Sequence, residues 1–213
     1  MKAFIYVGGS IYPNNITEHP KADDICIAAD VGAKNAKILG DTPDIIVGDF
    51  DSSKLEILKE EFPKAEITLV PAEKDFTDSE LAIQTAIAKG ANEIVIIGGL
   101  DGRLDHTLVN ISLLENLSKN GFYVTATDGK NRVRYIESTS TLIPRSYFKY
   151  ISLIPRTEKL KGVTVMGCTY PLENAKLTTA SAGLTVSNEI TGNCAFIAVK
   201  KGGLLIIESS DII

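Results

Sequence analysis

The chain contains the stretch Ile45-Ile46-Val47-Gly48-Asp49-Phe50-Asp51-Ser52, in which an apolar run ends at a glycine and is followed by two aspartates one residue apart. This pattern predicts a buried strand that ends at a metal site. Residues i and i+2 of an extended backbone point to the same side, so Asp49 and Asp51 can face one point in space. Mg²⁺ favours carboxylate oxygens and usually binds together with substrate phosphates. The alternative is that one aspartate caps the next helix and the other is solvated at a turn.

Around this stretch, short apolar runs alternate with helical patterns, which is typical of a parallel sheet covered by helices on both faces. Capping boxes at Ser53-x-x-Glu56 and Thr77-x-x-Glu80 mark the starts of two helices. We expect strands at residues 2–7, 25–29, 45–48, 66–70, 93–97 and 122–127, and helices at 33–39, 53–62, 77–90 and 106–120.

After Asp128 the helical spacing disappears, and short apolar runs recur between turn residues. Lys201-Gly202-Gly203 predicts a hairpin turn between strands at 196–199 and 204–208. We therefore expect two domains. The first is an α/β domain with a doubly wound, mostly parallel sheet over residues 1–130, and the second is an all-β sandwich over residues 131–213.

Length and composition describe an ordinary globular protein of 213 residues, 44% hydrophobic and 23% charged. No apolar run approaches the ~18 residues of a membrane span, and the first residues lack a signal segment, so a cytoplasmic location is expected. The net charge of −5 is evenly spread, and without a basic stripe we expect no nucleic-acid partner. The scattered Cys26, Cys168 and Cys194 favour buried reduced thiols over disulfides or a zinc site.

Four polar segments follow apolar runs of the expected parallel sheet. They contain Asp30, Asp49 with Asp51, residues 75–78, and the glycine-rich residues 98–105, and three of the four come directly after a strand. The carboxyl ends of parallel strands meet at one edge of a sheet, where ligands bind. We therefore expect these segments to converge, whereas independent turn aspartates would be scattered over both ends of the sheet.

The segment Gly98-Gly99-Leu100-Asp101-Gly102-Arg103-Leu104-Asp105 supplies backbone N–H donors, a guanidinium and a helix start, which suit a polyphosphate. The alternative is that its glycines serve only a tight turn. Asp105 is either a cap for the helix that starts at His106 or a site residue. His106 itself either packs at the helix start or acts in catalysis.

The segment Lys74-Asp75-Phe76-Thr77-Asp78 allows two readings as well. Asp75 and Asp78 flank a helix N-terminus, where acids are favourable for purely structural reasons. Lys74 is either solvated or reaches a phosphate. The local pattern leaves these alternatives open.

Four motifs together resemble, in order and spacing, those of the thiamine pyrophosphokinase family. They are residues 46–52, residues 74–78, residues 98–106 and Ser187-Asn188-Glu189, and they span nearly the whole chain. The resemblance implies a catalytic α/β domain joined to a β-sandwich that helps to bind thiamine. It also implies transfer of pyrophosphate from ATP to the hydroxyethyl oxygen of thiamine, which gives thiamine diphosphate and AMP.

The resemblance implies roles for individual residues. Asp49 and Asp51 would be the principal Mg²⁺ ligands, with Asp75 as a further ligand or water-holder. Asp78 would orient the thiamine pyrimidine or accept the hydroxyl proton. Arg103 would stabilise phosphate charge, while Asp105 would fix Arg103 or contact the nucleotide. Nucleotide contacts are expected from Asp30, Ser52, Lys74, Thr77, Gly99, Gly102, Arg103 and His106.

The resemblance further implies that Ser187 and Asn188 meet the thiamine pyrimidine across the interface of a homodimer. The chain departs from the family in two ways. Ala29-Asp30-Val31-Gly32-Ala33-Lys34 replaces the common Ala-Asp-Gly-Gly-Ala-Asn, and there is no tryptophan to face the cationic thiamine, for which Tyr170 or Phe196 are candidates. Three other functions stay open: a pyrophosphokinase acting on a pterin alcohol, a Mg²⁺-dependent phosphohydrolase, and a non-catalytic nucleotide-binding module.

Overall fold

The structure is a computed structural model that describes residues 1–50, 52–71 and 76–211. The chain divides into two compact units, residues 1–113 with 122–129 and residues 114–121 with 130–213. Each unit contains a buried apolar cluster of its own. Among the described helices, none is both long and apolar enough to cross a membrane.

The strands of the first unit lie in the order β4-β3-β2-β1-β5-β6, and each neighbouring pair is parallel. All four residues of β3 are buried, as expected for a sheet covered on both faces, where strands are continuous apolar runs. The predicted doubly wound, mostly parallel sheet is confirmed. The strands are β1 (Lys2–Tyr6), β2 (Ile25–Ala29), β3 (Ile45–Gly48), β4 (Glu66–Leu69), β5 (Glu93–Ile97) and β6 (Tyr123–Thr127).

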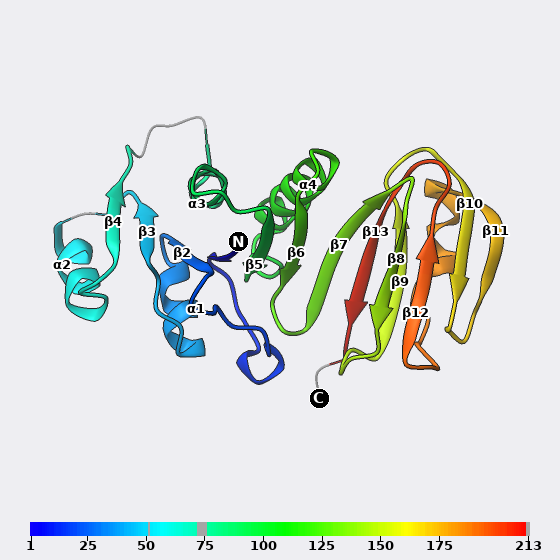
Figure 1. Ribbon diagram of the computed structural model, residues 1–213, viewed down its shortest axis with the longest axis horizontal. Coiled ribbons are helices and arrows are strands. Elements are labelled where there is room, and N and C mark those ends of the chain that lie inside the picture. Colours follow the sequence, from blue (N-terminus) through cyan, green and yellow to red (C-terminus); the bar gives the residue numbers. More distant parts are fainter. Residues whose placement is uncertain (51, 72–75, 212–213) are drawn as a thin grey trace. The chain divides into compact units, whose positions relative to one another are not determined.

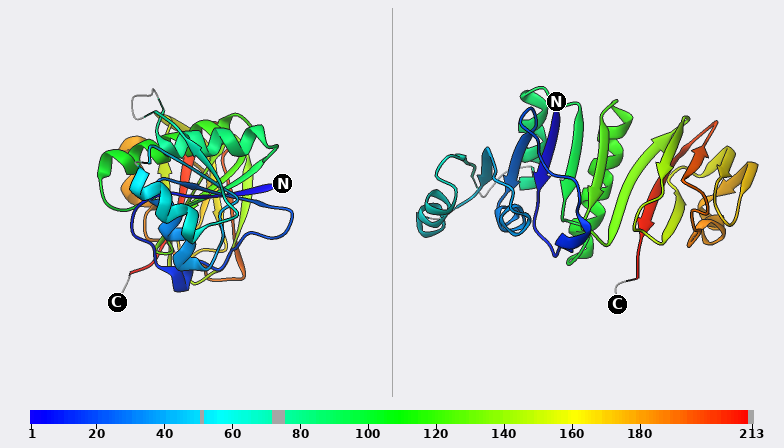
Figure 2. Two further views of the ribbon diagram at one scale, coloured as in Figure 1. Left: turned by 90° about the vertical axis from the view of Figure 1, so that its left-hand side faces the viewer. Right: turned by 60° about the horizontal axis from the view of Figure 1, so that its bottom comes forward.

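Helices cover both faces of this sheet. The connections through α1 (Gly32–Leu39) and α2 (Ser52–Glu61) run toward β4, and those through α3 (Asp78–Ala88) and α4 (Leu104–Lys119) run back to β5 and on to β6. Because such crossovers are right-handed, the two directions put α1 and α2 on one face and α3 with the first part of α4 on the other (Figure 1, Figure 2). A 3₁₀ turn, η1 (Pro13–Asn15), lies between β1 and β2.

One predicted helix start is confirmed and two are wrong in detail. Thr77 caps α3 in the predicted capping box with Glu80, through backbone-to-side-chain hydrogen bonds of 2.8 and 3.2 Å. α2 begins at Ser52, so Ser53 lies inside the helix. α4 begins at Leu104, so Asp105 lies in its first turn instead of capping a helix that starts at His106. A carboxylate is favourable anywhere in a first turn, which allows this earlier start.

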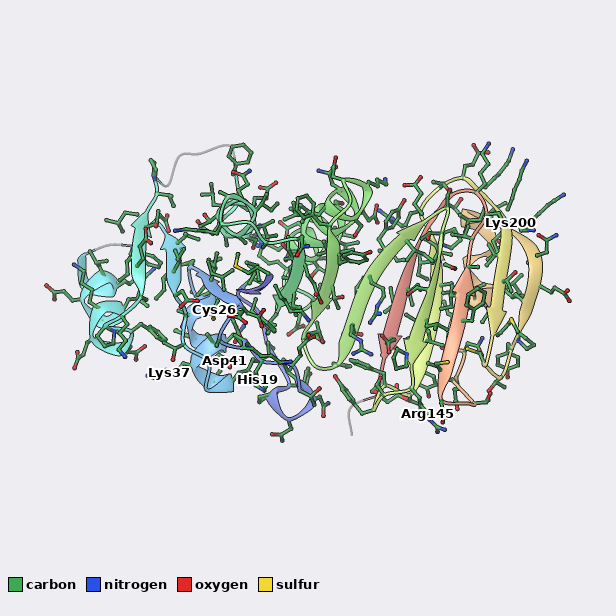
Figure 3. All side chains as sticks on the ribbon, viewed as in Figure 1. His19, Cys26, Lys37, Asp41, Arg145 and Lys200 are labelled. Carbon is green, nitrogen blue, oxygen red and sulfur yellow. The ribbon has the colours of Figure 1, made fainter. Side chains whose placement is uncertain are left out.

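Tyr6, the last residue of β1, takes part in a hydrogen-bonded cluster of the first unit. The buried Tyr6 hydroxyl donates to Asp41 Oδ2 at 2.6 Å, and His19 Nδ1 lies 3.0 Å from both Asp41 carboxylate oxygens (Figure 3). Burial, together with the charge of Asp41, raises the pKa of the Cys26 thiol, so this thiol stays protonated. Asp41 therefore fastens the connection between β1 and β2 to the core.

The second unit is a β-sandwich. Its sheets have the orders β7-β13-β9 and β11-β10-β12-β8, with antiparallel neighbours, and side chains from both sheets form one core. The predicted second fold class is confirmed. The elements are β7 (Asn131–Glu137), β8 (Ser140–Pro144), β9 (Tyr150–Pro155), β10 (Lys159–Met166), β11 (Leu172–Thr178), η2 (Thr179–Thr185), β12 (Cys194–Ala198) and β13 (Gly203–Ser209).

Two predictions for this unit are wrong. The segment Lys201-Gly202-Gly203 does not form a hairpin, because β12 pairs with β8 and β10 whereas β13 pairs with β7 and β9. The turn therefore carries the chain from one sheet to the other. Cys168 is buried, but Cys194 is exposed because the first residue of β12 turns outward in that strand's alternation.

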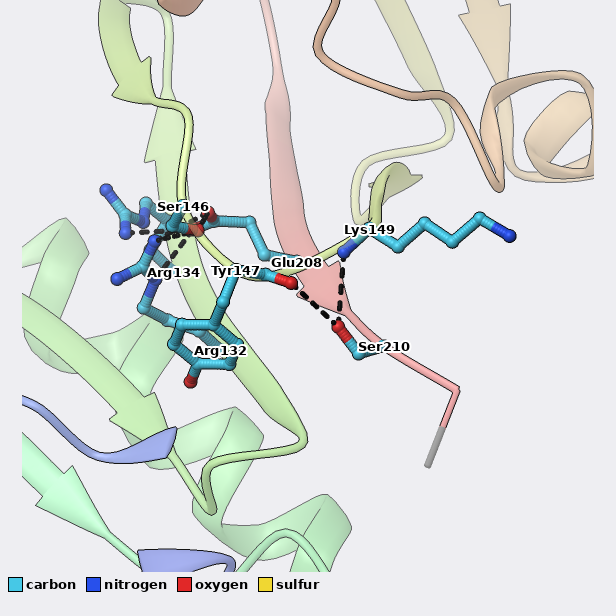
Figure 4. Close-up of polar contacts among 7 residues, drawn as sticks. All are labelled: Arg132, Arg134, Ser146, Tyr147, Lys149, Glu208 and Ser210. Carbon is cyan, nitrogen blue, oxygen red and sulfur yellow. Dashed lines mark hydrogen bonds and ion pairs between the residues drawn. The ribbon is translucent and has the colours of Figure 1, made fainter. Parts of the chain in front are cut away.

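A cluster of charged side chains lies on the buried face of the β7 and β13 pair. Arg132 pairs directly with Glu208 in the strand register, on the same face as the buried Ile206. Arg132 donates to Glu208 through Nε and Nη2 at 2.7 and 2.6 Å, and Arg134 Nη2 donates at 3.1 Å (Figure 4). The Ser146 hydroxyl adds a fourth hydrogen bond of 3.3 Å. The buried carboxylate is thus surrounded by donors.

Candidate active site

The strand order of the first unit reverses at β1, with β2 to β4 on one side and β5 and β6 on the other. In doubly wound sheets, ligands bind beyond the carboxyl ends of the strands at this reversal. A cavity of about 540 Å³ lies there. Its walls are the loop after β1, the loop after β5, and the first turns of α3 and α4.

Many of the residues predicted to contact nucleotide lie in this one cavity. Its lining includes Thr77, Gly99, Gly102, Arg103, Asp105 and His106, together with Gly8 and Gly9 of the loop after β1. Asp78, the partly exposed first residue of α3, follows Thr77 directly. The fold therefore brings the glycine-rich segment and the start of α3 together, although they are far apart in sequence.

Arg103 and Asp105 form an ion pair with two hydrogen bonds at the cavity wall. Arg103 Nε donates to Asp105 Oδ1 at 3.1 Å, and Nη2 donates to Oδ2 at 2.6 Å. The hydrogen bond from Arg103 holds the pKa of Asp105 at about 2, so the carboxylate is ionised at neutral pH. The pair uses two of the five N–H donors of the guanidinium, which leaves donors for an anionic ligand.

Two glycine loops line the cavity: the loop after β1, with Gly8 and Gly9, and the loop after β5, with Gly98, Gly99 and Gly102. Two asparagines that the sequence analysis did not single out bind these loops. The buried Asn35 of α1 donates from Nδ2 to the carbonyl oxygens of Val7 and Gly9, at 2.7 and 3.0 Å. Asn110 of α4 donates to the carbonyl oxygen of Gly99 at 3.0 Å. The sequence offered one signal for Asn35, a poor helix former inside an expected helix, whereas the burial of its amide, which then needs a partner, is seen in the structure.

Asp30 lines a neighbouring cavity of about 510 Å³ between α1 and α2, with Lys34 and Lys54. Val31 lines both cavities. It has φ −63° and ψ −10°, an ordinary right-handed conformation, so this position does not require the glycine that the family commonly has. The next residue does require glycine, because a Cβ on Gly32 would lie 2.1 Å from the carbonyl oxygen of Tyr6.

At the end of β3, Asp49 is exposed and Phe50 packs against the core of the first unit. A Cβ on Gly48 would lie 2.5 Å from Cζ of Phe50, so the aromatic ring covers the glycine. Ser52 is the first residue of α2. Asp51, Lys74 and Asp75 lie outside the described residues.

The metal prediction depends on residues that are only partly described. Within residues 1–50, 52–71 and 76–211, no three His, Cys, Asp or Glu side chains lie close enough to hold one metal ion. Asp49 is the one predicted ligand in these ranges, and its exposed carboxylate at the carboxyl edge is the hard oxygen donor that suits Mg²⁺.

In the second unit, Ser187 and Asn188 follow η2. Ser187 has φ 57°, and the Asn188 side chain is bonded to the backbone of Tyr170, accepting from its N–H at 2.9 Å and donating to its carbonyl at 2.8 Å. The exposed Tyr170 and the partly buried Asn188 line one small hollow with Leu184. Phe196 does not line this hollow, so Tyr170 is the aromatic residue that lies with the motif.

Solved structures share this architecture over the whole length. The chain superposes on thiamine pyrophosphokinase from Bacillus subtilis with a TM-score of 0.87 and 28% identity, covering 100% of both chains. For thiamin pyrophosphokinase from Geobacillus thermodenitrificans the TM-score is 0.84 and the identity is 26%, covering 99% and 98%. An α/β unit followed along the chain by a β-sandwich, with this likeness over the whole length, places the chain among kinases built from these two units.

Sequence comparison identifies the family within that class. Residues 17–126 match the thiamin pyrophosphokinase catalytic domain, and residues 139–204 match the thiamin pyrophosphokinase vitamin B1 binding domain. The thiamine pyrophosphokinase of Bacillus subtilis is 32% identical over 217 residues, which cover 99% of this chain and 100% of the relative. The chain therefore belongs to the thiamin pyrophosphokinase family, and the resemblance inferred from the four motifs is confirmed.

Proposed function

We propose that this enzyme transfers the pyrophosphoryl group of ATP to the hydroxyethyl oxygen of thiamine, which yields thiamine diphosphate and AMP. The observation that carries the proposal is the cavity at the strand reversal, where two glycine loops, a helix start and the Arg103–Asp105 pair meet. Such a cavity offers N–H donors and positive charge to a polyphosphate. The match to a vitamin B1 binding domain supports thiamine as the acceptor.

In the proposed reaction, the thiamine hydroxyl oxygen attacks the β-phosphorus of ATP. The bond between this phosphorus and the oxygen bridging to the α-phosphorus breaks, and AMP leaves with that oxygen. Asp78 is the candidate that orients thiamine or accepts the hydroxyl proton, and Arg103 stabilises charge on the phosphate oxygens, because phosphoryl transfer depends on positioning and charge neutralisation. Asp105 fixes Arg103, and the remaining nucleotide contacts are Asp30, Ser52, Lys74, Thr77, Gly99, Gly102 and His106.

Mg²⁺ is part of the proposal, with Asp49, Asp51 and Asp75 as its ligands. When bound, the ion neutralises charge on the triphosphate. We expect Asp51→Asn to abolish Mg²⁺-dependent turnover, measured over a range of Mg²⁺ concentrations, while the variant still melts cooperatively. A fully active Asp51→Asn enzyme would remove the metal assignment.

The second unit is proposed to contribute the thiamine contacts Ser187 and Asn188, with Tyr170 facing the cationic ring in place of a tryptophan. The same proposal includes a homodimer with shared active sites, a cytoplasmic location, and a division into a catalytic domain over residues 1–130 and a thiamine-binding and dimerisation domain over residues 131–213. The thiamine contacts and the homodimer are supported by the family resemblance alone, the division into domains also by the loss of helical spacing after Asp128, and the location is carried over from the sequence analysis.

One assay tests the reaction: AMP formation from ATP and Mg²⁺ is followed with and without thiamine. We expect AMP only with thiamine. Phosphate release without any acceptor would indicate a phosphohydrolase, and turnover of a pterin alcohol in place of thiamine would indicate a different acceptor. The absence of AMP with every acceptor would reduce the protein to a nucleotide-binding module.

A further inference from the structure

The two glycine loops of the cavity are joined by hydrogen bonds that begin on α1 and end on α4. Asn35 donates to the carbonyl oxygens on either side of Gly8, those of Val7 and Gly9. The carbonyl oxygen of Gly8 accepts from the N–H of Gly99 at 2.8 Å. Asn110 then donates to the carbonyl oxygen of Gly99. Two helix side chains thus fix both loops.

These hydrogen bonds determine which backbone atoms of the two loops are available to a ligand in the cavity. The carbonyl oxygens of residues 7, 8, 9 and 99 each accept a hydrogen bond from the protein. By contrast, the N–H groups of Gly9 and Gly102, which also line the cavity, donate to no acceptor in the described part of the chain. The backbone at these positions therefore offers N–H donors to an anion, because the carbonyl lone pairs that would repel it are directed to the asparagines and to the other loop.

We propose that Asn35 and Asn110 are positioning residues for phosphate binding, an inference that rests on the proposed use of ATP. The amide of Asn35 serves two carbonyl oxygens with one NH₂ group, and a carboxylate would not suit this position because it has no proton to donate. The two loops and the Asn110 side chain are also closely packed. A Cβ on Gly98 would lie 2.7 Å from the carbonyl oxygen of Val7, and one on Gly99 would lie 2.4 Å from Nδ2 of Asn110.

The test compares Asn35→Ala and Asn110→Ala with Asn116→Ala, a control on α4 whose side chain is exposed at the far end of the helix. Binding of inorganic tripolyphosphate is measured by calorimetry, and KM is measured separately for ATP and for thiamine. We expect tripolyphosphate binding to weaken about tenfold in each cavity variant, with a matching rise in the KM for ATP. The KM for thiamine should not change in either cavity variant. The control Asn116→Ala should leave tripolyphosphate binding and both KM values unchanged.

The double variant adds a second readout. Since both amides act on loops bonded to each other, losing both should weaken tripolyphosphate binding by less than the product of the single effects. Unchanged tripolyphosphate binding in Asn110→Ala, or an equal rise in both KM values, would overturn the inference. Should Asn35→Ala fail to fold, Asn110→Ala decides alone, because its side chain is only partly buried. If the wild-type protein bound no tripolyphosphate, the proposed ATP site itself would be wrong and this inference would fall with it.

Discussion

Each unit contains an arginine that holds a carboxylate through Nε and Nη2, and the two pairs differ in their exposure to water. In the β-sandwich, the Arg132 and Glu208 side chains are 26% and 2% exposed. In the α/β unit, the Arg103 and Asp105 side chains are 73% and 61% exposed. The geometry is similar, whereas the surroundings differ.

This difference in exposure distinguishes Arg132–Glu208, which is a structural pair, from Arg103–Asp105, which a ligand can reach. Arg132 is also covered by the Phe148 ring, whose centroid lies 4.9 Å from Cζ, and Arg134 and Ser146 occupy further acceptor positions of Glu208. Removing one partner of such a buried pair leaves a charge without compensation. Arg103 lies at the wall of an open cavity, where water screens the pair and a phosphate can approach.

The largest effect should come from the buried pair. We expect Glu208→Gln to lower the free energy of unfolding by about 3 kcal/mol, because two arginines then lose the negative charge between them. Urea unfolding followed by circular dichroism measures the change. Glu158→Gln is the matched control, since Glu158 and Lys159 form an exposed pair at 3.5 Å, and it should stay within about 0.5 kcal/mol of wild type. Equal stability of both variants would refute the structural role of Glu208.

The second effect should appear in turnover and not in folding. Arg103→Ala is expected to reduce kcat about a hundredfold, through lost stabilisation of phosphate charge. Its melting temperature should equal that of wild type, because the side chain is exposed. Arg145→Ala removes another exposed arginine, in the second unit (Figure 3), and should leave kcat unchanged. A fully active Arg103→Ala enzyme would contradict the role proposed for this residue.

A smaller effect is expected from Asp105→Asn, which weakens the support of Arg103 without removing it. The ratio kcat/KM for ATP should fall about fivefold or less, as is usual for exposed ion pairs. Steady-state kinetics at fixed Mg²⁺ measure this change. A loss as large as that of Arg103→Ala would mean that Asp105 itself touches the substrate.

The smallest effect concerns protonation. Hydrogen bonding by Arg103 lowers the pKa of Asp105 from its usual 3.8 to about 2. A lowered pKa means that the pairing is fully present above pH 4 and is lost as the pH falls toward 2. Carbon NMR of the Asp105 carboxyl should therefore show titration near pH 2, and Arg103→Ala should return it toward 3.8. Titration near 3.8 in the wild-type protein would argue that the pair is open in solution.

The parallel sheet could be predicted from the sequence because its strands β1, β2, β3 and β5 are nearly continuous apolar runs, whereas β4 and β6 mix polar and apolar residues. The strand partners in the sandwich could not, since residues 196–199 and 204–208 are both apolar and the glycines between them suit either a hairpin or a crossing between sheets. Alternation tells which face of a strand is buried, but it does not tell which strand lies beside it.

The same limit applies to the candidate site. Thr77 and Glu80 are neighbours along the chain, so their spacing suggested the contact, and the family resemblance suggested that of Asp105 with Arg103. Asn35 lies 28 residues from Val7, and both of its partners are backbone carbonyl groups that any residue would offer. The residue types at positions 7 and 9 therefore give no sign that the Asn35 side chain binds there.

The Phe50 ring lies over Gly48, and this has a consequence for sequence variation within the family. The Phe50 ring occupies the space that a side chain at position 48 would need. Residues 48 and 50 should therefore vary together: relatives with a larger residue at position 48 should carry a smaller one at position 50. Asp49 and Asp51 flank Phe50 in the sequence. An exchange of side-chain volume between positions 48 and 50 would therefore also change the backbone that carries the two aspartates.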